Sequence, residues 1–363
     1  METRAAKRSA DAAGVPENQS PKKKRVVLGE LPNLSNAIVH VNPKSGLVPQ
    51  KPKCRTKTKG KKVATTAKST SKTEPDVKSL IDAKLEDPET CGPYVSDIYM
   101  YLREMEMDPK RRPKPYYLET VQQDVTANMR GILIDWLVEV AEEYKLLSDT
   151  LYLSVSYIDR FLSMTVVNRQ KLQLLGVSSM LIASKYEEIT PPHVEEFCYI
   201  TDNSFTKEEV VKMEADILKS LKFEMGNPTV KTFLRKFAVV AQENNKTTNL
   251  QLEFLAYYLA ELSLLDYNLV KCSPSLVAAS VIFLAKFIIY PKRHPWSSAL
   301  QEYSGYKSSD LKECVVGLHD LYLGRRGGSL QAVREKYKQH KFKCVAVMPS
   351  PPEITASFFE NQW

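Results

Sequence analysis

The chain has 363 residues, of which 43% are hydrophobic and 26% are charged, and its formal net charge at pH 7 is +8. This length allows two domains with flanking tails, and the apolar content is sufficient for a hydrophobic core. The sequence contains neither a run of about 18 apolar residues nor the apolar core of a signal peptide, so it indicates neither a membrane span nor secretion.

Residue types that form catalytic or metal sites occur here without the spacing that such sites need. The cysteines lie at positions 54, 91, 198, 272, 314 and 344, and the histidines at 40, 193, 294, 319 and 340. Neither set contains a CxxC pair or paired zinc-binding histidines, so we expect free thiols and no metal. Glycine-rich phosphate loops, GxSxG and kinase motifs are also missing from the sequence, which predicts a protein that is no enzyme and needs no cofactor.

Positive charge is concentrated in the first 74 residues, which contain 17 Lys and Arg against 5 Asp and Glu. The remainder contains 34 basic and 38 acidic side chains, so it is slightly acidic. The basic isoelectric point is therefore a property of the N-terminal tail, and it does not indicate direct nucleic-acid binding by a folded surface.

Residues 1–90 are rich in Lys, Ser, Thr and Pro without a sustained hydrophobic period, so we predict a disordered basic tail. One compact basic cluster fits the acidic grooves of a nuclear import receptor and consists of Lys22, Lys23, Lys24 and Arg25. A solvated charge run or a loose nucleic-acid contact is the alternative. Ser20 precedes Pro21 in a proline-directed kinase pattern, and a phosphate there would add about −1.5 to −2 charge beside the cluster. An unmodified Ser-Pro dipeptide is the alternative reading of this pattern.

The same tail contains the spacing R-x-x-L-x-x-x-x-N, formed by Arg25, Leu28 and Asn33. This spacing resembles the destruction box that mitotic ubiquitin ligases recognise in an extended peptide. Because a lysine-rich disordered tail also supplies ubiquitin acceptors, the pattern predicts regulated degradation.

Residues 91–127 are expected to form one separate helix followed by a linker. From Tyr94 the sequence YVSDIYMYLREMEMD places apolar side chains on one side of a helix, namely Ile98, Tyr101, Leu102 and Met105. The prolines at 109, 113 and 115 then interrupt helical structure. We expect the apolar side of this helix to dock on another part of the chain.

From Asn128, a plausible N-cap, the sequence predicts a helix that is apolar on nearly every side and therefore central to a bundle. Ser148 and Asp149 are expected to cap a second helix. Arg130 and Asp159 are charges within these apolar helices. Since a buried charge is tolerated mainly when it is paired, we expect the two to face each other, with solvent-exposed helix edges as the alternative.

The helical pattern of residues 128–226 repeats in residues 227–345 with a constant offset of about 101 residues. Trp136 then corresponds to Phe237, and Tyr157 to Tyr258. Helix caps are expected at Thr206, at Asn227 before Pro228 and at Ser273 before Pro274. The sequence predicts an all-α protein of two tandem five-helix bundles, followed by a C-terminal tail, residues 346–363, with a Ser-Pro dipeptide at Ser350.

The segments MRGILIDWLVEV, YIDRFLS, KLQLLG and ASKYEE closely resemble the A-type cyclins, most of all those of plants, and the likeness extends from about Tyr94 to Lys343. This resemblance implies two cyclin boxes and a non-catalytic subunit that binds and activates a cyclin-dependent Ser/Thr kinase from S phase to mitosis. It also implies a protein of the nucleus, with some in the cytoplasm, that is removed by ubiquitin-dependent degradation.

The resemblance assigns roles to individual residues. Structural roles fall to Arg130, Asp159 and Leu174. Hydrogen bonds to the kinase backbone fall to Lys185 and Glu214. The surrounding apolar kinase contacts would be Ile182, Tyr186, Leu218, Phe223, Ile98 and Tyr101, for each of which ordinary core packing is the alternative.

A second site is implied for Arg-x-Leu peptides of substrates and inhibitors. Its residues would be Met129, Ile132, Leu133, Trp136, Glu139, Arg169, Leu172 and Gln173, with Glu139 pairing with the arginine of the peptide. Periodicity alone would assign the four apolar residues of the first helix to the core. Two positions depart from the family: Gly131 replaces Ala and is expected to cost the helix about 0.5–1 kcal/mol, and Tyr186 replaces Phe and adds a hydroxyl that needs a partner.

Two other functions fit parts of the sequence pattern. A TFIIB-like transcription factor also joins two cyclin-like repeats, but that family carries an N-terminal zinc ribbon, and here only Cys54 and Cys91 precede the repeats. A helical scaffold without a kinase requires that the pairing of Lys185 with Glu214 be a coincidence.

Overall fold

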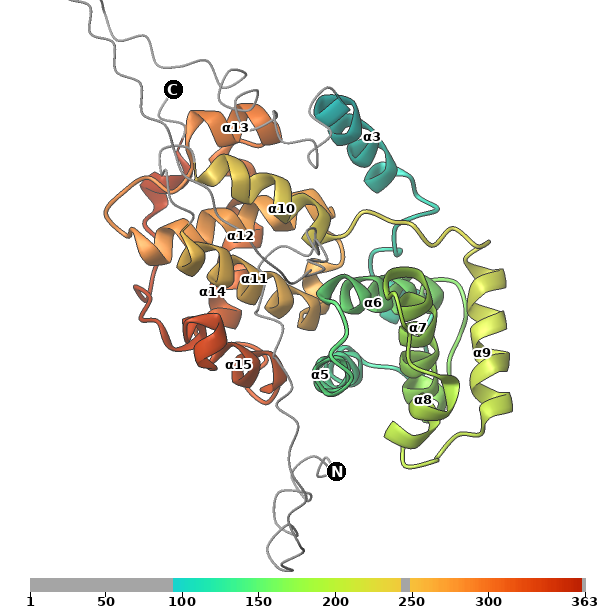
Figure 1. Cartoon of the computed structure of the whole chain (residues 1–363). Coiled ribbons are helices and arrows are strands. Elements are labelled where there is room, and N and C mark those ends of the chain that lie inside the picture. The colour runs from blue at the N-terminus through green and yellow to red at the C-terminus, as the bar shows by residue number, and fades with distance from the viewer. Residues whose placement is uncertain (1–93, 243–248, 361–363) are drawn as a thin grey trace, which may run out of the picture. The chain divides into compact units, whose positions relative to one another are not determined.

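The computed structural model describes residues 94–242 and 249–360, and all regular secondary structure in these ranges is helical (Figure 1). This agrees with the all-α prediction. The import cluster, the destruction-box pattern and Ser20 lie outside the described residues.

The first box is a five-helix bundle followed along the chain by a second. Its helices are α5 (Ala127–Glu143), α6 (Ser148–Leu162), α7 (Leu172–Glu187), α8 (Val194–Ile200) and α9 (Lys207–Ser220), with the short turn η3 (Arg169–Lys171) before α7. Helix α7 contacts α5, α6, α8 and α9 and is buried over most of its length. The prediction that the helix near residue 128 is central is therefore wrong, since α5 leaves Ile132 52% exposed.

The second box repeats this arrangement and confirms the predicted duplication. It consists of α10 (Val230–Ala241), α11 (Leu250–Leu265), α12 (Pro274–Ile289), α13 (Ser298–Ser304) and α14 (Ser308–Tyr322), with η4 (Tyr267–Leu269) between α11 and α12. Helix α12 is the counterpart of α7 and packs against α10, α11 and α14 (Figure 1). Both central helices are apolar on nearly every side, as a helix surrounded by other helices must be.

Shorter elements flank the two bundles. Before the first box lie α3 (Val95–Met107) and α4 (Tyr117–Thr120). After the second box lie α15 (Ala332–Tyr337) and the turns η5 (His340–Phe342), η6 (Val345–Val347) and η7 (Ala356–Phe359). Helix α15 packs on α5 and α11, and so joins the end of the second box to the first helix of the first box.

The first residues of the helices show which predicted caps depend on local sequence and which are overridden by distant contacts. Thr206 caps α9 by accepting a hydrogen bond from the backbone N–H of Glu209, and Ser273 precedes Pro274 at the start of α12, as predicted. The other predicted caps are wrong, because Thr126 caps α5, Leu147 precedes α6 and Thr229 precedes α10. Asn227 is buried and accepts a hydrogen bond from Arg111 at 3.2 Å, so a distant contact uses the side chain that was expected to cap a helix.

Helix α3 docks on the second box through a face that matches the prediction only in part, since Leu102 packs on the core as expected but Tyr99 does so in place of Tyr101. The ring of Tyr99 lies 6.2 Å from that of Phe233 and 5.0 Å from that of Tyr303. Near the end of the helix, buried Glu106 accepts a hydrogen bond of 2.9 Å from the backbone N–H of Ser275. Because Tyr99 and Glu106 determine the docked face, Tyr101 points elsewhere and is 59% exposed.

Candidate functional site

Lys185 and Glu214 form an ion pair on the surface of the first box. Lys185 lies in the last turn of α7 and Glu214 in α9, and the Lys185 Nζ to Glu214 Oε1 distance is 2.6 Å. The lysine side chain is 51% exposed and the glutamate 14% exposed. The pairing holds the ammonium in place while leaving part of it accessible, so the site can donate hydrogen bonds to another protein.

The apolar side chains predicted to contact the kinase lie on the same two helices or directly after α9, at different depths. Ile182 is buried and Leu218 is half-buried, whereas Tyr186 and Phe223 are 55% and 68% exposed. Phe223 has a φ of +60°, a backbone conformation that is rare for a bulky residue. It follows the end of α9 and donates its backbone N–H to the carbonyl of Leu218 at 3.0 Å, so the turn that ends the helix also directs the ring outward.

A hollow of about 510 Å³ lies beside the ion pair and extends the candidate surface. Lys185 and Glu214 line it together with Val211, the loop from Ile189 to His193 and the first two residues of α8. Ile189 is fully exposed and Val211 is 44% exposed. The sequence analysis missed both residues, although an isoleucine just before Thr190-Pro191-Pro192 cannot continue a buried helical stripe and is a signal for an exposed apolar side chain.

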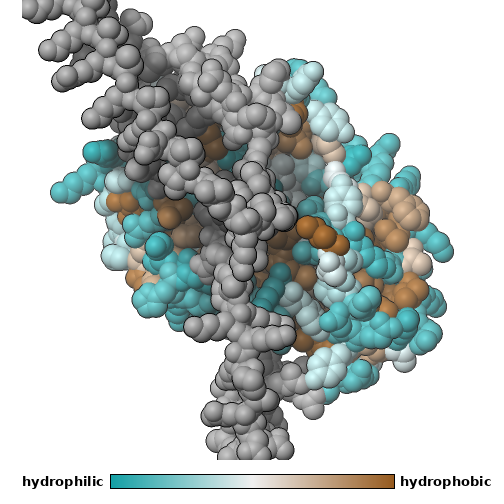
Figure 2. Space-filling model, viewed as in Figure 1, coloured by the Kyte–Doolittle hydropathy of each residue, from teal (hydrophilic) through white to brown (hydrophobic). Residues whose placement is uncertain are grey.

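Exposed apolar side chains also occur on α3, where Ile98 is 37% and Tyr101 59% exposed. Figure 2 shows hydrophobic residues at the surface among hydrophilic ones on the face that it draws. Single exposed apolar residues are ordinary on a protein surface. The first box differs because several large apolar residues are exposed on one pair of helices and the loops after them. Ile189 and Val211 line the hollow beside Lys185, Tyr186 follows Lys185 in the chain, and Phe223 follows α9.

The departure from the family at Tyr186 has a local explanation. Its hydroxyl lies over Gly226, where an added Cβ atom would be only 2.6 Å from the hydroxyl oxygen. The hydroxyl therefore points toward the backbone that joins the two boxes, and Gly226 provides the space for it.

The residues predicted to dock Arg-x-Leu peptides are only partly at the surface. On α5, Ile132 is 52% exposed, and Met129, Trp136 and Glu139 are half-buried. Leu133 is buried against Gly176 of α7, where an added Cβ would be 2.8 Å from its Cδ1 atom. The assignment of all four apolar residues to the core, which periodicity alone favours, is therefore wrong for Ile132.

The remaining docking candidates lie at the start of α7. Arg169 is exposed, with its side chain 3.7 Å from that of Asp124, while Gln173 is half-buried and Leu172 is buried. Burial, and then the nearby Asp135, raise the pKa of Glu139 above its usual value. A raised pKa means that the ionised form of Glu139 is destabilised, and an approaching cation would stabilise it. The position therefore suits a partner with positive charge.

Arg130 and Asp159 face each other where the two boxes meet. Both guanidinium contacts, from Nε to Oδ1 and from Nη2 to Oδ2, measure 2.7 Å, and both residues are buried. Arg130 also donates to the backbone carbonyl of Leu264 in α11 at 2.9 Å, and Tyr117 donates to Asp159 at 2.8 Å. Burial alone would lower the pKa of Arg130, but the Asp159 carboxylate raises it. The pair thus fastens α5 to α6 and to the second box.

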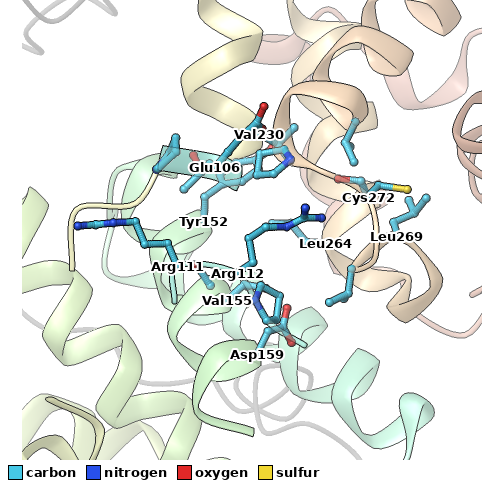
Figure 3. Close-up of a pocket in the computed structure, with 18 of the residues that line it drawn as sticks. Glu106, Arg111, Arg112, Tyr152, Val155, Asp159, Val230, Leu264, Leu269 and Cys272 are labelled. Carbon is cyan, nitrogen blue, oxygen red and sulfur yellow. The ribbon is translucent and has the colours of Figure 1, made fainter. Parts of the chain in front are cut away.

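A cavity of about 120 Å³ lies at this junction (Figure 3). Arg130 and Asp159 line it, together with Glu106, Arg112 and Cys272. In the part of the chain that the structure describes, no group of three His, Cys, Asp or Glu side chains is placed to hold a metal ion. Across the same residues, no helix combines the length and the apolar character needed to cross a bilayer.

Comparison with known proteins identifies the class to which this fold and surface belong. The family model "Cyclin, N-terminal domain" matches residues 97–226, and the model "Cyclin, C-terminal domain" matches residues 228–351. The chain belongs to the cyclin family.

Within this family the chain is similar to plant A-type members, which confirms the resemblance seen in its motifs. It is 59% identical to "Putative cyclin-A3-1" of Arabidopsis thaliana over 99% of this chain and 96% of that protein. It is 58% identical to "G2/mitotic-specific cyclin C13-1" of Daucus carota over 93% of this chain and 96% of that protein. A solved viral cyclin from herpesvirus saimiri shares the fold, with a TM-score of 0.54 and 24% identity over 63% of this chain and 96% of that chain.

Proposed function

We propose that this chain is the regulatory subunit of a cyclin-dependent Ser/Thr kinase and that the kinase binds the first box around Lys185 and Glu214. The observation that carries the proposal is the 2.6 Å ion pair between helices α7 and α9, surrounded by exposed apolar side chains. Exposed aromatic and aliphatic side chains beside a fixed polar pair suit a protein interface, because aromatic residues are enriched in interfaces and a limited number of hydrogen bonds accompanies the buried apolar area.

The mechanism is a shift between two states of the kinase. A kinase with its catalytic Lys and Glu apart cannot position ATP, and a rigid partner that contacts only the assembled state favours that state. Changing a 1:99 ratio into 99:1 requires a difference in binding free energy of about 5.5 kcal/mol. The exposed apolar residues of α7, α9 and the loops after them are suited to supply much of this difference, because they lose contact with water only when the assembled kinase lies against them.

A double substitution tests this function directly. Lys185→Ala combined with Glu214→Ala is expected to abolish binding and activation of a cyclin-dependent kinase while the circular dichroism and melting temperature stay near those of the unmodified protein. Lys271→Ala combined with Glu313→Ala removes a comparable surface ion pair from the second box and should leave activation intact. Full activation by the first variant, or equal loss with both variants, would show that the kinase does not bind at this face.

The surface of α5 around Ile132 and Trp136 is proposed to dock Arg-x-Leu peptides of substrates and inhibitors, with Glu139 receiving the peptide arginine. Its support is the exposure of Ile132 next to a half-buried carboxyl group whose pKa is raised. Ile132→Ala and Trp136→Ala should weaken phosphorylation of Arg-x-Leu substrates and spare a short peptide without that motif. An equal loss on both substrates would count against docking at α5.

The two patterns of the N-terminal tail are proposed to direct the protein to the nucleus and to its destruction in mitosis. Changing Lys22, Lys23 and Lys24 to Ala should reduce nuclear accumulation of a fluorescent fusion, and Arg25→Ala with Leu28→Ala should lengthen its lifetime in mitosis. Unchanged localisation or lifetime would reject the corresponding signal.

A further inference from the structure

The chain covers part of its second box with its own C-terminal strap, which we define as residues 348–360. Tyr322 donates a hydrogen bond to the carbonyl of Met348 at 2.6 Å. Farther along, the ring of Phe359 stacks on that of Phe283 with a centroid distance of 5.2 Å and an interplanar angle of 9°. Phe358 packs edge-on against Phe287. The strap is thus held by rings near its end and by hydrogen bonds near its start.

The internal repeat identifies the face that the strap covers. With an offset of 101 residues, three residues beside the open ion pair of the first box correspond to three residues under the strap. Ile182 corresponds to Phe283, Tyr186 to Phe287, and Leu218 to His319. Tyr186 is 55% exposed, whereas its counterpart Phe287 is 2% exposed. The strap therefore occupies, on the second box, the equivalent of the face that the first box leaves open.

Ser350 makes a polar contact with one of the residues of this covered face. Its Oγ atom lies 3.0 Å from Nε2 of His319, and the serine is half-buried. Residues 348–355 form no helix, and Pro349, Pro351 and Pro352 keep the segment extended. An extended serine followed by proline is the form of substrate that a proline-directed kinase accepts once the strap has lifted from the box.

We infer that Ser350 is a phosphorylation site for a proline-directed Ser/Thr kinase and that its phosphate releases the C-terminal strap from the second box. In the reaction the γ-phosphoryl group of ATP is transferred to Ser350 Oγ, the hydroxyl proton is lost, and ADP leaves. A hydroxyl in contact with a buried imidazole is thereby replaced by a group with about −1.5 to −2 charge.

The surroundings of Ser350 are poorly matched to that charge. His319 is 3% exposed, and burial and then Arg325 lower its pKa, so the ring is held neutral. Arg325 already pairs with Asp320 at 3.2 Å and donates to the carbonyl of Pro352 at 2.8 Å. A phosphate at Ser350 would lose water and would replace a hydroxyl that contacts a neutral ring, while Arg325 is already engaged by the Asp320 carboxylate. Both effects favour the detached strap.

Site-specific phosphoserine in the full chain tests the consequence. Phosphoserine at position 350 should accelerate hydrogen exchange of the strap amides by about tenfold or more, because the contact with His319 is lost and a charged group would have to lose water to stay in place. Phosphoserine at Ser357, which is exposed within the same strap, provides a control of equal charge and should change exchange little. Unchanged or slower exchange with phosphoserine at 350, or the same acceleration at 357, would overturn the release.

Modification itself is tested with the purified full chain, ATP and a mitogen-activated protein kinase, which is proline-directed. Mass spectrometry should find a phosphate on Ser350, and Ser350→Ala should remove that phosphopeptide. Absence of phosphate from Ser350 in a reaction that modifies another Ser-Pro site of the chain would overturn the assignment. Neither experiment involves the face around Lys185, so failure here leaves the proposed kinase binding untouched.

Discussion

Replacing Arg130 with Ala is expected to be among the most damaging single changes outside the apolar core. The substitution leaves the Asp159 carboxylate buried with one remaining side-chain donor, the hydroxyl of Tyr117, and it removes the 2.9 Å bond to the carbonyl of Leu264. Breaking a buried ion pair by removing one partner costs about 3–5 kcal/mol. For a folded region of this size, each kcal/mol lowers the melting temperature by about 2–4 °C, so a fall of roughly 10 °C is expected.

Tyr117→Phe is the matched comparison for this prediction. It removes one hydrogen bond to the same carboxylate but leaves the ion pair, and its effect should be about 1.5–3 kcal/mol, as for a hydrogen bond to a charged group. Urea denaturation of both variants, followed by tryptophan fluorescence and circular dichroism, gives the two free energies of unfolding. If Arg130→Ala lowers that free energy no more than Tyr117→Phe does, the pair does not fasten the boxes and the reasoning from burial fails.

Three further changes probe packing, docking and charge. Gly176→Ala should lower the free energy of unfolding by about 1 kcal/mol, because its Cβ would lie 2.8 Å from Cδ1 of Leu133 and overpacking outweighs the better helix propensity; a more stable variant in urea denaturation would contradict this. Glu106→Gln should make α3 more sensitive to limited proteolysis, since the buried carboxylate that holds the first turn of α12 through the N–H of Ser275 loses its charge; unchanged cleavage between residues 94 and 107 would argue against this docking. Burial lowers the pKa of Lys231 to about 8, below its value of about 10.4 in the unfolded chain, so the unfolded state binds more protons between these pH values. The free energy of unfolding should therefore rise from about pH 8 to 10.4 relative to Lys231→Met, and parallel pH profiles would rule this out.

The duplicated bundle was predictable because it rests on signals that are local or periodic. Apolar spacing located the helices, and Thr206 with Glu209 forms a capping box that needs no distant partner. The failed cap at Asn227 shows the limit of such signals. A cap residue followed by proline is ambiguous when the same side chain can accept a hydrogen bond from Arg111, which lies 116 residues earlier in the chain.

Docked faces were harder to predict than helices, since the partner determines which side is buried. Periodicity placed Tyr101 on the buried side of α3, but the rings of Phe233 and Tyr303 select Tyr99 instead. The same difficulty applies to Phe223. Its exposure results from the turn that ends α9, and no hydrophobic pattern in the sequence predicts it.

The two boxes show how one fold acquires two different surfaces. At the position of Glu214 the second box has Val315, which is completely buried, so the lysine–glutamate pair of the first box has no acidic counterpart there. The strap then covers the surrounding face and buries Phe287, while the equivalent Tyr186 stays in solvent. Because the helix arrangement is shared, the difference lies in side chains at equivalent positions, above all Glu214 against Val315, and in one covering segment. A partner that requires a carboxylate beside an open apolar rim can therefore bind the first box and not the second, and no change of fold is needed to make that distinction.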